Sequence, residues 1–411
     1  MSSIVEKVRE TVVAAEVDVI VAGGGPAGLA AAVAASRNGA QTLLVERYGY
    51  LGGLATGGLV ICLVETARYG YGICREVIDK LSELKATRLN KASGEPAHWV
   101  EGASLSGEES YHFDPEAFKY VADRLATESG SELLFHSFIV DPIMKGREVR
   151  GIILEGKSGR QAVLGKAIVD ATGDADVAAA AGVPCNVDRH PWGINLEYRM
   201  GNVDFDRALQ WKKDNQELYE SLMMKLEKDV GKIGWGETVY KGVAWSHGPH
   251  FHDVDGLNTR HLTRVEVESR LAIMKGLRFL RENLPGFEDA FVMEAAPQIG
   301  VRETRRIVGE YTLTKDDALM GRRFEDAIAK GPFDIPYRCL VPTEVDGLLV
   351  AGRCISTTHE AQGVIRNIPP CMVTGQAAGT AAALAATRGV NPRRLNVHVL
   401  REALRNQGVE L

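Results

Sequence analysis

The first fifty residues alternate between apolar runs and a Gly-rich turn. The apolar run 18–22 is followed by a turn at 23–25 and then by the small residues 27–35, which are typical of a helix packed closely on a sheet. The stretch 41–45, apolar at 43–45, predicts another strand. The order strand, turn, helix, strand predicts a parallel βαβ unit.

The middle of the chain carries short apolar stretches with alternating polarity. Separated by Gly-containing turns, they lie at 132–137, 138–145, 149–154 and 161–164. Alternation of this kind, repeated over short distances, predicts a β-meander. A further apolar strand is expected at 167–170, ending at Thr172-Gly173-Asp174.

The last eighty residues repeat the strand-then-helix pattern. The apolar run 348–353 predicts a buried strand, the polar stretch 354–370 a loop, and the small residues 371–386 a helix. Gly375 and Gly379 lie one turn apart in that helix, which gives it a face that can approach another backbone.

The stretch between these two patterns has a different character. Residues 182–331 hold four of the five tryptophans and a denser set of charges, and Thr263 and Glu266 form a capping box that predicts the start of a long helix. We therefore predict an α/β protein with a Rossmann-like domain containing the β-meander and a mixed α+β substrate or cap domain. The expected division is a helical or disordered leader at 1–16, the first domain at 17–181 and 332–411, and the cap at 182–331.

Composition narrows the function. The chain has 411 residues, 45% of them apolar and 25% charged, with a net charge of −6, and its Lys and Arg residues are scattered. This gives no electrostatic footprint for nucleic acid or an anionic membrane. No apolar run is long enough to span a bilayer, and charges interrupt any signal-peptide core at the N-terminus, so a cytoplasmic protein is expected. The six dispersed cysteines include no C-x-x-C, which favours buried free thiols.

The turn after the first strand carries a G-x-G-x-x-G motif at Gly23, Gly25 and Gly28. The first glycine permits a tight turn, the second lets a pyrophosphate approach the backbone, and the third lets helix and strand pack closely. Pro26 fits the first helical turn because its missing N–H is not needed there. Glu46 ends the second strand at the spacing of a ribose-binding carboxylate, which disfavours a 2′-phosphate and hence NADP. The motif predicts a bound dinucleotide.

Several segments together resemble the FAD-dependent oxidoreductases with a glutathione-reductase-type flavin fold. They are the Gly23–Gly28 turn with Glu46-Arg47, the loop Leu51-Gly52-Gly53-x-x-Thr56, the strand end Ala171–Asp174, the stretch 299–311 and the stretch 348–381. On this resemblance the cofactor is FAD. The chain contains one convincing Rossmann turn, so a separate NAD(P)H domain is not evident.

The resemblance also implies where FAD binds. The three glycines would cradle the pyrophosphate, Glu46 the adenosine ribose, Gly52 and Gly53 the ribityl chain or flavin ring, and Ile139 the adenine. Thr172-Gly173-Asp174 would flank the diphosphate, and Gly352-Arg353 with the start of the last helix would hold the ribityl chain and the flavin N1–O2 end. The full expected set is Gly23, Gly25, Pro26, Ala27, Gly28, Glu46, Arg47, Gly52, Gly53, Thr56, Ile139, Ala171, Thr172, Gly173, Asp174, Gly352, Arg353 and Asn367.

The candidate catalytic residues are His359, Arg305 and Arg366. His359 and Arg366 lie between the last strand and the last helix, and an imidazole titrates near neutral pH, although a loop histidine that bonds only to backbone is an equal alternative. Arg305, one of a cluster with Arg302 and Arg306, is expected to contact substrate or flavin, although at least one of the three is expected in a salt-bridge network.

A histidine motif, His247-x-x-His250-x-His252, is a further candidate. It permits a metal site, but its spacing suits a loop in the wall of a pocket, and no metal site is predicted.

The predicted activity is hydride transfer between a small organic substrate and FAD, with reoxidation by oxygen, a quinone or a partner protein. Three alternatives stay open: a flavin-dependent tRNA-modifying transferase, a thiazole-synthase-like enzyme, and a non-catalytic electron-relay subunit. Neither nucleic acid nor membrane is an expected partner, and assembly into a homo-oligomer is left open, as are the substrate, the electron acceptor and covalent attachment of FAD.

Overall fold

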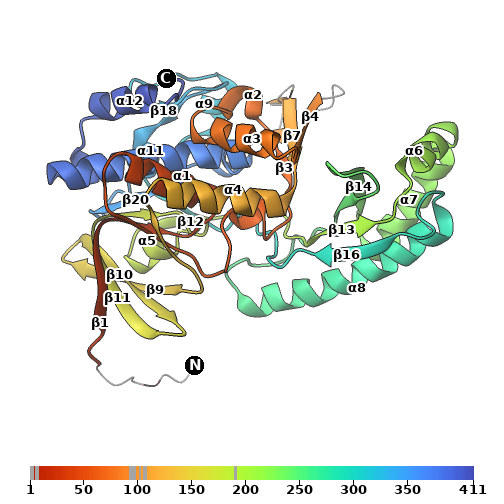
Figure 1. Cartoon of the computed structure of the whole chain (residues 1–411), viewed down its shortest axis with the longest axis horizontal. Coiled ribbons are helices and arrows are strands. Elements are labelled where there is room, and N and C mark those ends of the chain that lie inside the picture. Colours follow the sequence, from red (N-terminus) through yellow and green to blue (C-terminus); the bar gives the residue numbers. More distant parts are fainter. Residues whose placement is uncertain (1–3, 5–8, 92–98, 101–102, 105–108, 189–191) are drawn as a thin grey trace.

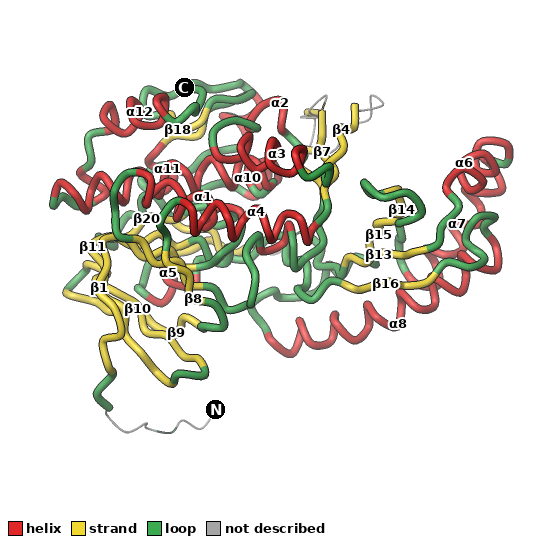
Figure 2. The backbone as a smooth tube through the Cα atoms, in the orientation of Figure 1, coloured by secondary structure: helices red, strands yellow, loops and turns green. Residues whose placement is uncertain are grey.

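A computed structural model describes residues 4, 9–91, 99–100, 103–104, 109–188 and 192–411. It shows an elongated molecule in which a large sheet covered by helices forms one end and a smaller sheet with α6, α7 and α8 forms the other (Figures 1 and 2). The α/β fold class predicted from the sequence is confirmed.

The large sheet is built on five parallel strands in the order β8-β2-β1-β11-β20. Their carboxyl ends are aligned, because Ala22 at the end of β1 pairs with both Val45 and Asp170, and Asp170 pairs in turn with Val350. The strands are β1 (Val12–Ala22), β2 (Thr42–Val45), β8 (Glu132–Leu134), β11 (Gly159–Asp170) and β20 (Leu348–Val350).

The β-meander is shorter than expected from the sequence. It consists of β9 (Phe138–Lys145), β10 (Glu148–Gly156) and the first half of β11, paired antiparallel, whereas β8 pairs parallel with β2 at the opposite side of the sheet. The stretches expected at 161–164 and 167–170 are one strand, because Gly165 and its neighbours stay paired with β1. The same pairing extends β1 back to Val12, into the segment expected to be a helical or disordered leader.

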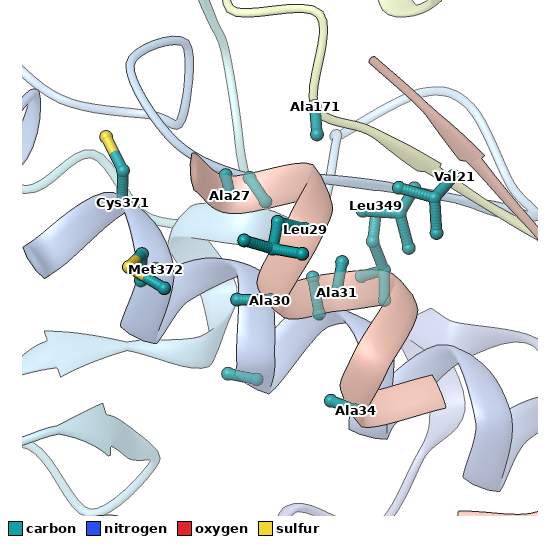
Figure 3. Close-up of a cluster of buried hydrophobic side chains, with 14 of the residues drawn as sticks. Val21, Ala27, Leu29, Ala30, Ala31, Ala34, Ala171, Leu349, Cys371 and Met372 are labelled. Carbon is teal, nitrogen blue, oxygen red and sulfur yellow. The ribbon is translucent and has the colours of Figure 1, made fainter. Parts of the chain in front are cut away.

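Two helices of small residues, α1 (Pro26–Arg37) and α11 (Ile368–Arg388), pack against each other over the sheet (Figure 3). A Cβ at Gly375 would clash with the carbonyl oxygen of Ala27, and a Cβ at Gly379 with that of Ala31. The close approach of backbones predicted for these glycines is therefore present, and it fixes the last helix against the first.

Two boundaries near the C-terminus differ from the sequence expectation. Helix α11 begins at Ile368, three residues before the expected start, because Pro369 and Pro370 occupy its first turn, where proline is tolerated. The segment expected to be a polar loop contains a seven-residue helix, α10 (His359–Ile365), whose residues 361–365 are buried.

The smaller sheet has the order β14-β15-β13-β16 and lies on helix α8 (Thr259–Asn283). Its strands are β13 (Glu197–Gly201), β14 (Gly234–Glu237), β15 (Ala244–His247) and β16 (Phe291–Ala295), accompanied by α6 (Phe205–Asp214) and α7 (Gln216–Val230). Its core residues lie between 196 and 296, joined by Leu59 from the first domain. Ile307, Leu313 and Ile328, which fall within the expected cap 182–331, belong to the larger core.

The predicted capping box does not start α8. The helix begins five residues earlier, where its N-cap Asn258 accepts hydrogen bonds from the N–H groups of Arg260 and His261. Asn258 thus takes the capping role expected of Thr263, and Thr263 instead donates its hydroxyl to the carbonyl of Thr259.

The remaining elements surround the large sheet. They are η1 (Gly53–Ala55), β3 (Cys62–Leu63), α2 (Thr66–Tyr69), α3 (Ile73–Glu83), β4 (Thr87–Lys91), β5 (Trp99–Val100), β6 (Ala103–Ser104), β7 (Glu109–Phe113), α4 (Pro115–Glu128), α5 (Asp176–Ala180), β12 (Cys185–Val187), β17 (Arg305–Ile307), α9 (Lys315–Leu319), β18 (Ala327–Ala329), β19 (Ile335–Pro336), η2 (Tyr337–Leu340), η3 (Pro392–Arg394) and α12 (Val397–Asn406). Within the described residues no helix is long and apolar enough to cross a bilayer.

The contact between α1 and α11 gives a first prediction. We expect Gly379→Ala to lower the free energy of unfolding by about 2 kcal/mol or more, because the added methyl group must push two backbones apart and overpacking of a core costs roughly 1–3 kcal/mol. Denaturant titration followed by far-UV circular dichroism measures the change. Gly236→Ala is the matched control, since a Cβ there meets nothing within 4 Å; equal effects of the two substitutions would contradict the assignment.

Candidate functional site

A deep cavity opens where the parallel strands of the large sheet end. It measures about 960 Å³ with its mouth. The turns after β1, β2, β11 and β20 all contribute to its wall. The lining residues are Gly23, Gly25, Pro26, Ala27, Val45, Glu46, Arg47, Tyr48, Gly53, Leu54, Ser137, Phe138, Ile139, Ala171, Thr172, Gly173, Asp176, Gln298, Ala351, Gly352, Arg353, Arg366, Ile368 and Cys371.

The three glycines of the first turn differ in what surrounds them. Gly23 has a φ of +96°, which L side chains rarely adopt, and a Cβ at Gly28 would clash with the carbonyl oxygen of Gly23. Gly25 has an ordinary φ of −66°, and a Cβ there would meet nothing within 4 Å. Gly23 and Gly28 are therefore required by the fold, whereas Gly25 keeps the cavity open at the start of α1.

Glu46 is buried at one end of the cavity. Its Oε2 accepts from Gly24 N–H at 2.6 Å and its Oε1 from Tyr48 N–H at 2.8 Å. Burial raises the pKa of Glu46, and these two N–H groups oppose that effect. Each oxygen keeps a free lone pair, so the carboxylate can still accept hydrogen bonds from a pair of hydroxyls in the cavity.

The end of β11 is held by a buried carboxylate. Asp170 accepts hydrogen bonds from the N–H and hydroxyl of Thr172 and from Ala178 N–H. Burial raises its pKa to about 6. Asp174, next along, bonds to the hydroxyl of Thr304 and forms an ion pair with Arg353 at 3.0 Å. Asp174 does not line the cavity itself, and its role here is to hold Arg353.

Two arginines make the other end of the cavity cationic. Burial lowers the pKa of Arg366 to about 9, with further lowering by the charges of Arg302 and Arg353, so it remains charged at neutral pH. Among the described residues, Nε of Arg366, one Nη of Arg353 and Oε1 of Gln298 are buried without a hydrogen-bond partner. Buried polar atoms are seldom left unpaired, so these atoms indicate a polar, anionic ligand.

The start of α11 adds its dipole to this end of the cavity. Asn367 is the N-cap, and its buried Nδ2 has no partner among the described residues. Pro369 and Pro370 carry no N–H, so Ile368 is left as the donor in the first three helical residues. The positive end of the helix therefore acts mainly through charge, together with Arg366.

These features fit FAD. Three features follow one another along the cavity. They are a carboxylate for ribose hydroxyls, an open glycine at a helix N-terminus for phosphates, and a cationic end for the electron-rich flavin.

The expected cofactor residues divide into two groups. Thirteen of them line the cavity, from Gly23 to Arg353, but Gly28, Gly52, Thr56, Asp174 and Asn367 do not. Gly52 donates its N–H to the Gly24 carbonyl, and Thr56 donates its hydroxyl to the Leu51 carbonyl, so both shape the loop behind the wall. The roles proposed for individual residues in holding FAD stay predictions.

The sequence missed ten lining residues. Most are neighbours of expected ones, such as Tyr48, Leu54, Phe138 and Ile368. Gln298 is different, because it comes from the loop 298–304 that returns from the cap, and no motif marks it.

Of the three candidate catalytic residues, Arg366 alone lines the cavity. His359 stacks on Trp192 with ring centroids 4.5 Å apart, and its Nδ1 lies 2.7 Å from the buried Oε2 of Glu303. Burial lowers the pKa of His359. Arg366 lies over the same Trp192 ring, so His359 supports the wall in which Arg366 sits.

Arg305 and Arg306 are both engaged in ion pairs. Arg305 bonds to the Asp176 carboxylate at 2.9 Å and to the Asp174 carbonyl, and Arg306 pairs with Glu303. Both therefore belong to a salt-bridge network, the role expected for at least one arginine of this cluster. Among the described residues, no three His, Cys, Asp or Glu side chains are arranged to hold a metal ion.

The sequence matches a family model described as FAD dependent oxidoreductase, over residues 18–334 and 329–404. A curated relative, a thiamine thiazole synthase from Methanococcus vannielii, is 28% identical over 174 residues, which is 40% of this chain and 59% of that protein. The chain thus matches little more than half the length of this relative.

Solved structures share the fold over nearly the whole chain. A geranylgeranyl bacteriochlorophyll reductase-like protein from Thermoplasma acidophilum has a TM-score of 0.55 at 17% identity, covering 96% of this chain and 84% of its own. A flavin-dependent brominase has a TM-score of 0.53 at 15% identity, with 95% and 83% covered. The p-nitrophenol 4-monooxygenase of Pseudomonas putida has 0.51 at 13% identity, with 97% and 85% covered. At these identities the likeness concerns the fold.

The open space at Gly25 gives a prediction that separates binding from folding. We expect Gly25→Val to abolish retention of FAD, because the side chain occupies the space where the phosphates approach, while the unfolding midpoint of the cofactor-free protein stays within a few degrees of wild type. Absorbance of the protein after gel filtration measures bound FAD. Gly28→Ala is the contrasting variant and should lower stability; a yellow Gly25→Val protein would contradict the site.

Glu46 gives a prediction with a pH dependence. Its folded-state pKa is raised, so the ionised carboxylate opposes folding, and the wild type loses this part of its stability as the pH rises above the ordinary value for glutamate. We expect the stability of Glu46→Gln, relative to wild type, to improve from pH 4 to pH 8 in cofactor-free protein. In contrast, its FAD affinity should fall roughly tenfold to a hundredfold, since hydrogen bonds to charged groups contribute about 1.5–3 kcal/mol. Thermal unfolding and FAD titration measure the two effects; parallel pH curves would contradict the first.

Proposed function

The chain belongs to the family of FAD-dependent oxidoreductases, and from this premise we propose that it transfers a hydride between a small organic substrate and FAD. The observation that carries the proposal is the cavity itself, with a buried carboxylate at one end and two arginines at the other, of which Arg366 has no ion-pair partner among the described residues. When bound, FAD supplies a two-electron acceptor at its ring.

The residues of this chain would bind and orient the cofactor. Glu46 would accept hydrogen bonds from the ribose, the N-terminus of α1 would face the phosphates, and Arg353, fixed by Asp174, would lie beside them. Arg366, near the start of α11, would stabilise negative charge on the flavin ring. Glu46 is buried and Arg366 is half-buried, so their charges act in a region of lowered dielectric constant, where they are stronger than in water.

Reoxidation requires an acceptor outside the chain. Oxygen, a quinone or a partner protein are the candidates, and no second Rossmann turn supports a dedicated nicotinamide site.

A thiazole-synthase-like activity is the second candidate. It is favoured by the match of 174 residues to the thiamine thiazole synthase. It requires a bound adenylated molecule without flavin, whereas the proposed function requires FAD.

Two measurements on the purified protein test the proposal. We expect bound FAD close to one per chain, identified by its absorbance and by mass spectrometry after release. We also expect anaerobic loss of the flavin's visible absorbance with at least one member of a panel of alcohols, amines, hydroxy acids and enones.

The outcomes separate the candidates. A colourless protein that releases a nucleotide other than FAD favours the thiazole-synthase-like activity. Bound FAD that no compound in the panel reduces contradicts hydride transfer and favours an electron-relay subunit.

A further inference from the structure

The cap sheet has one apolar face and one polar face. Side chains alternate along a strand, and Tyr198, Met200 and Ala244 lie in the cap core. The opposite face therefore carries the residues between them. These are Glu197 and Arg199 on β13, and Trp245 and His247 on β15, paired as Glu197 with His247 and Arg199 with Trp245.

This polar face meets the first domain. Arg199 forms an ion pair with Asp114, the N-cap of α4, at 3.3 Å. The ring of Trp245 packs against the larger core and lies 6.1 Å from that of His112 on β7. On β14 the residues opposite His247 and Trp245 are Gly234 and Gly236, so no side chain from that strand covers them.

Glu197 and His247 form a carboxylate–imidazole pair on this face. Glu197 is 1% exposed, and its Oε1 lies 2.9 Å from His247 Nδ1 and accepts from Asn195 Nδ2 at 2.7 Å. Its buried Oε2 has no partner among the described residues. The His247 side chain is 40% exposed, and within the described chain its Nε2 has no hydrogen-bond partner. A buried carboxylate at Nδ1 fixes the tautomer and leaves Nε2 free to take a proton.

A cation lies beside the pair. Arg302 donates to the Gly193 carbonyl at 2.5 Å, contacts His250 at 3.3 Å and lies 3.9 Å from Glu197. Its charge also lowers the pKa of Arg366, so the two guanidinium groups lie near each other. The side chains of Arg302 and Arg366 are both largely removed from water, and two such cations near each other favour binding of an anion.

One loop connects this cluster to the cavity. Gln298 lines the cavity and donates its N–H to the Gly57 carbonyl. Two residues later, Gly300 pairs with Asn195, whose side chain bonds to Glu197, and Arg302 follows. The cluster therefore borders the arginine-rich end of the cavity, where Gln298 and Arg366 lie.

We propose that Glu197, His247 and Arg302 form the substrate side of the site, and that it takes a small hydroxy acid. Arg302 binds the substrate carboxylate, and His247 Nε2 takes the hydroxyl proton. Meanwhile the hydride on the carbinol carbon, with its electron pair, leaves for the FAD of the proposed function, and the C–O single bond becomes a carbonyl. Glu197 is a positioning residue. The inference rests on the proposed function, because FAD is the oxidant.

Neutral hydroxyls suit this cluster better than amines. An ammonium group would be repelled by Arg302 and Arg366, whereas a hydroxyl carries no charge.

The charged or titratable groups facing His247 and its neighbours are Glu197, Arg302, His250, His252, His112, Lys232, Arg199, Glu294 and Asp114.

Anaerobic reduction of the FAD-loaded protein tests the roles of the three residues. The probes are glycolate, lactate, malate and citrate, each compared with propane-1,2-diol, which lacks a carboxylate. We expect a hydroxy acid to reduce the flavin and the diol to fail. Arg302→Lys should raise the half-saturating concentration at least tenfold with little change in the limiting rate. His247→Gln should lower the limiting rate roughly 10²–10⁴-fold, the usual contribution of a general base.

Two further variants separate catalysis from structure. Glu197→Gln should lower the limiting rate of flavin reduction with little change in the half-saturating concentration, because His247 loses the charged partner that holds its ring in place. His252→Gln, in the same motif but exposed, is the matched control and should reduce the flavin at the wild-type rate. All variants should retain FAD, since none of these residues lines the cavity.

Binding without turnover gives a second readout. Malonate, which carries no oxidisable hydroxyl, should bind the wild-type protein in isothermal titration calorimetry and bind Arg302→Met at least tenfold more weakly. A His247→Gln protein that keeps both FAD and the wild-type reduction rate overturns the inference. Equal malonate affinities of the wild type and Arg302→Met also overturn it. Loss of FAD or failure of every compound to reduce it overturns the proposed function instead, and malonate binding still reports on the cluster.

Discussion

The in-register pairing of four parallel strands is the constraint on which the site depends. Ala22, Val45, Asp170 and Val350 lie in one row of hydrogen-bonded partners, so the turns that follow them open at the same edge of the sheet. Those turns supply Gly25, Glu46, Thr172 and Arg353 from parts of the chain more than three hundred residues apart. A shift of one residue in any of these strands would turn its side chains to the other face and remove its turn from the cavity.

The last strand and helix reach this edge because α11 can lie directly on α1. The glycines at 375 and 379 remove the two methyl groups that would separate the helices, and the start of α11 is thereby placed at the cavity. Pro369 and Pro370 leave the start of α11 with few N–H donors, so Arg353 and Arg366 provide most of the positive charge there. The packing of α11 thus places the start of the helix at the cavity, while two arginines that precede the helix supply most of the positive charge there.

Local motifs predicted the first half of the site, and long-range contacts decided the rest. The Gly turn, Glu46 and the end of β11 could be found from sequence because each is a strand followed by a turn with a required residue type. Gln298 could not be found this way, since it reaches the cavity through a hydrogen bond to Gly57. Arg305 was expected to contact substrate or flavin, and in the structure it bonds to the Asp176 carboxylate and the Asp174 carbonyl. The capping box at Thr263 failed because Asn258 caps the helix more than a turn earlier, which leaves Thr263 and Glu266 inside it.

The way the cap is joined to the rest of the chain bears on how such proteins diversify. The chain leaves the large domain before Ile194 and returns after Gly300, and these two points already touch through the bridge between Asn195 and Gly300. Because closure entropy grows only slowly with loop length, an insertion whose ends already meet costs its host domain little. A different segment between these two points would change the residues offered to the substrate, and apart from Gln298 the lining of the cavity lies outside it.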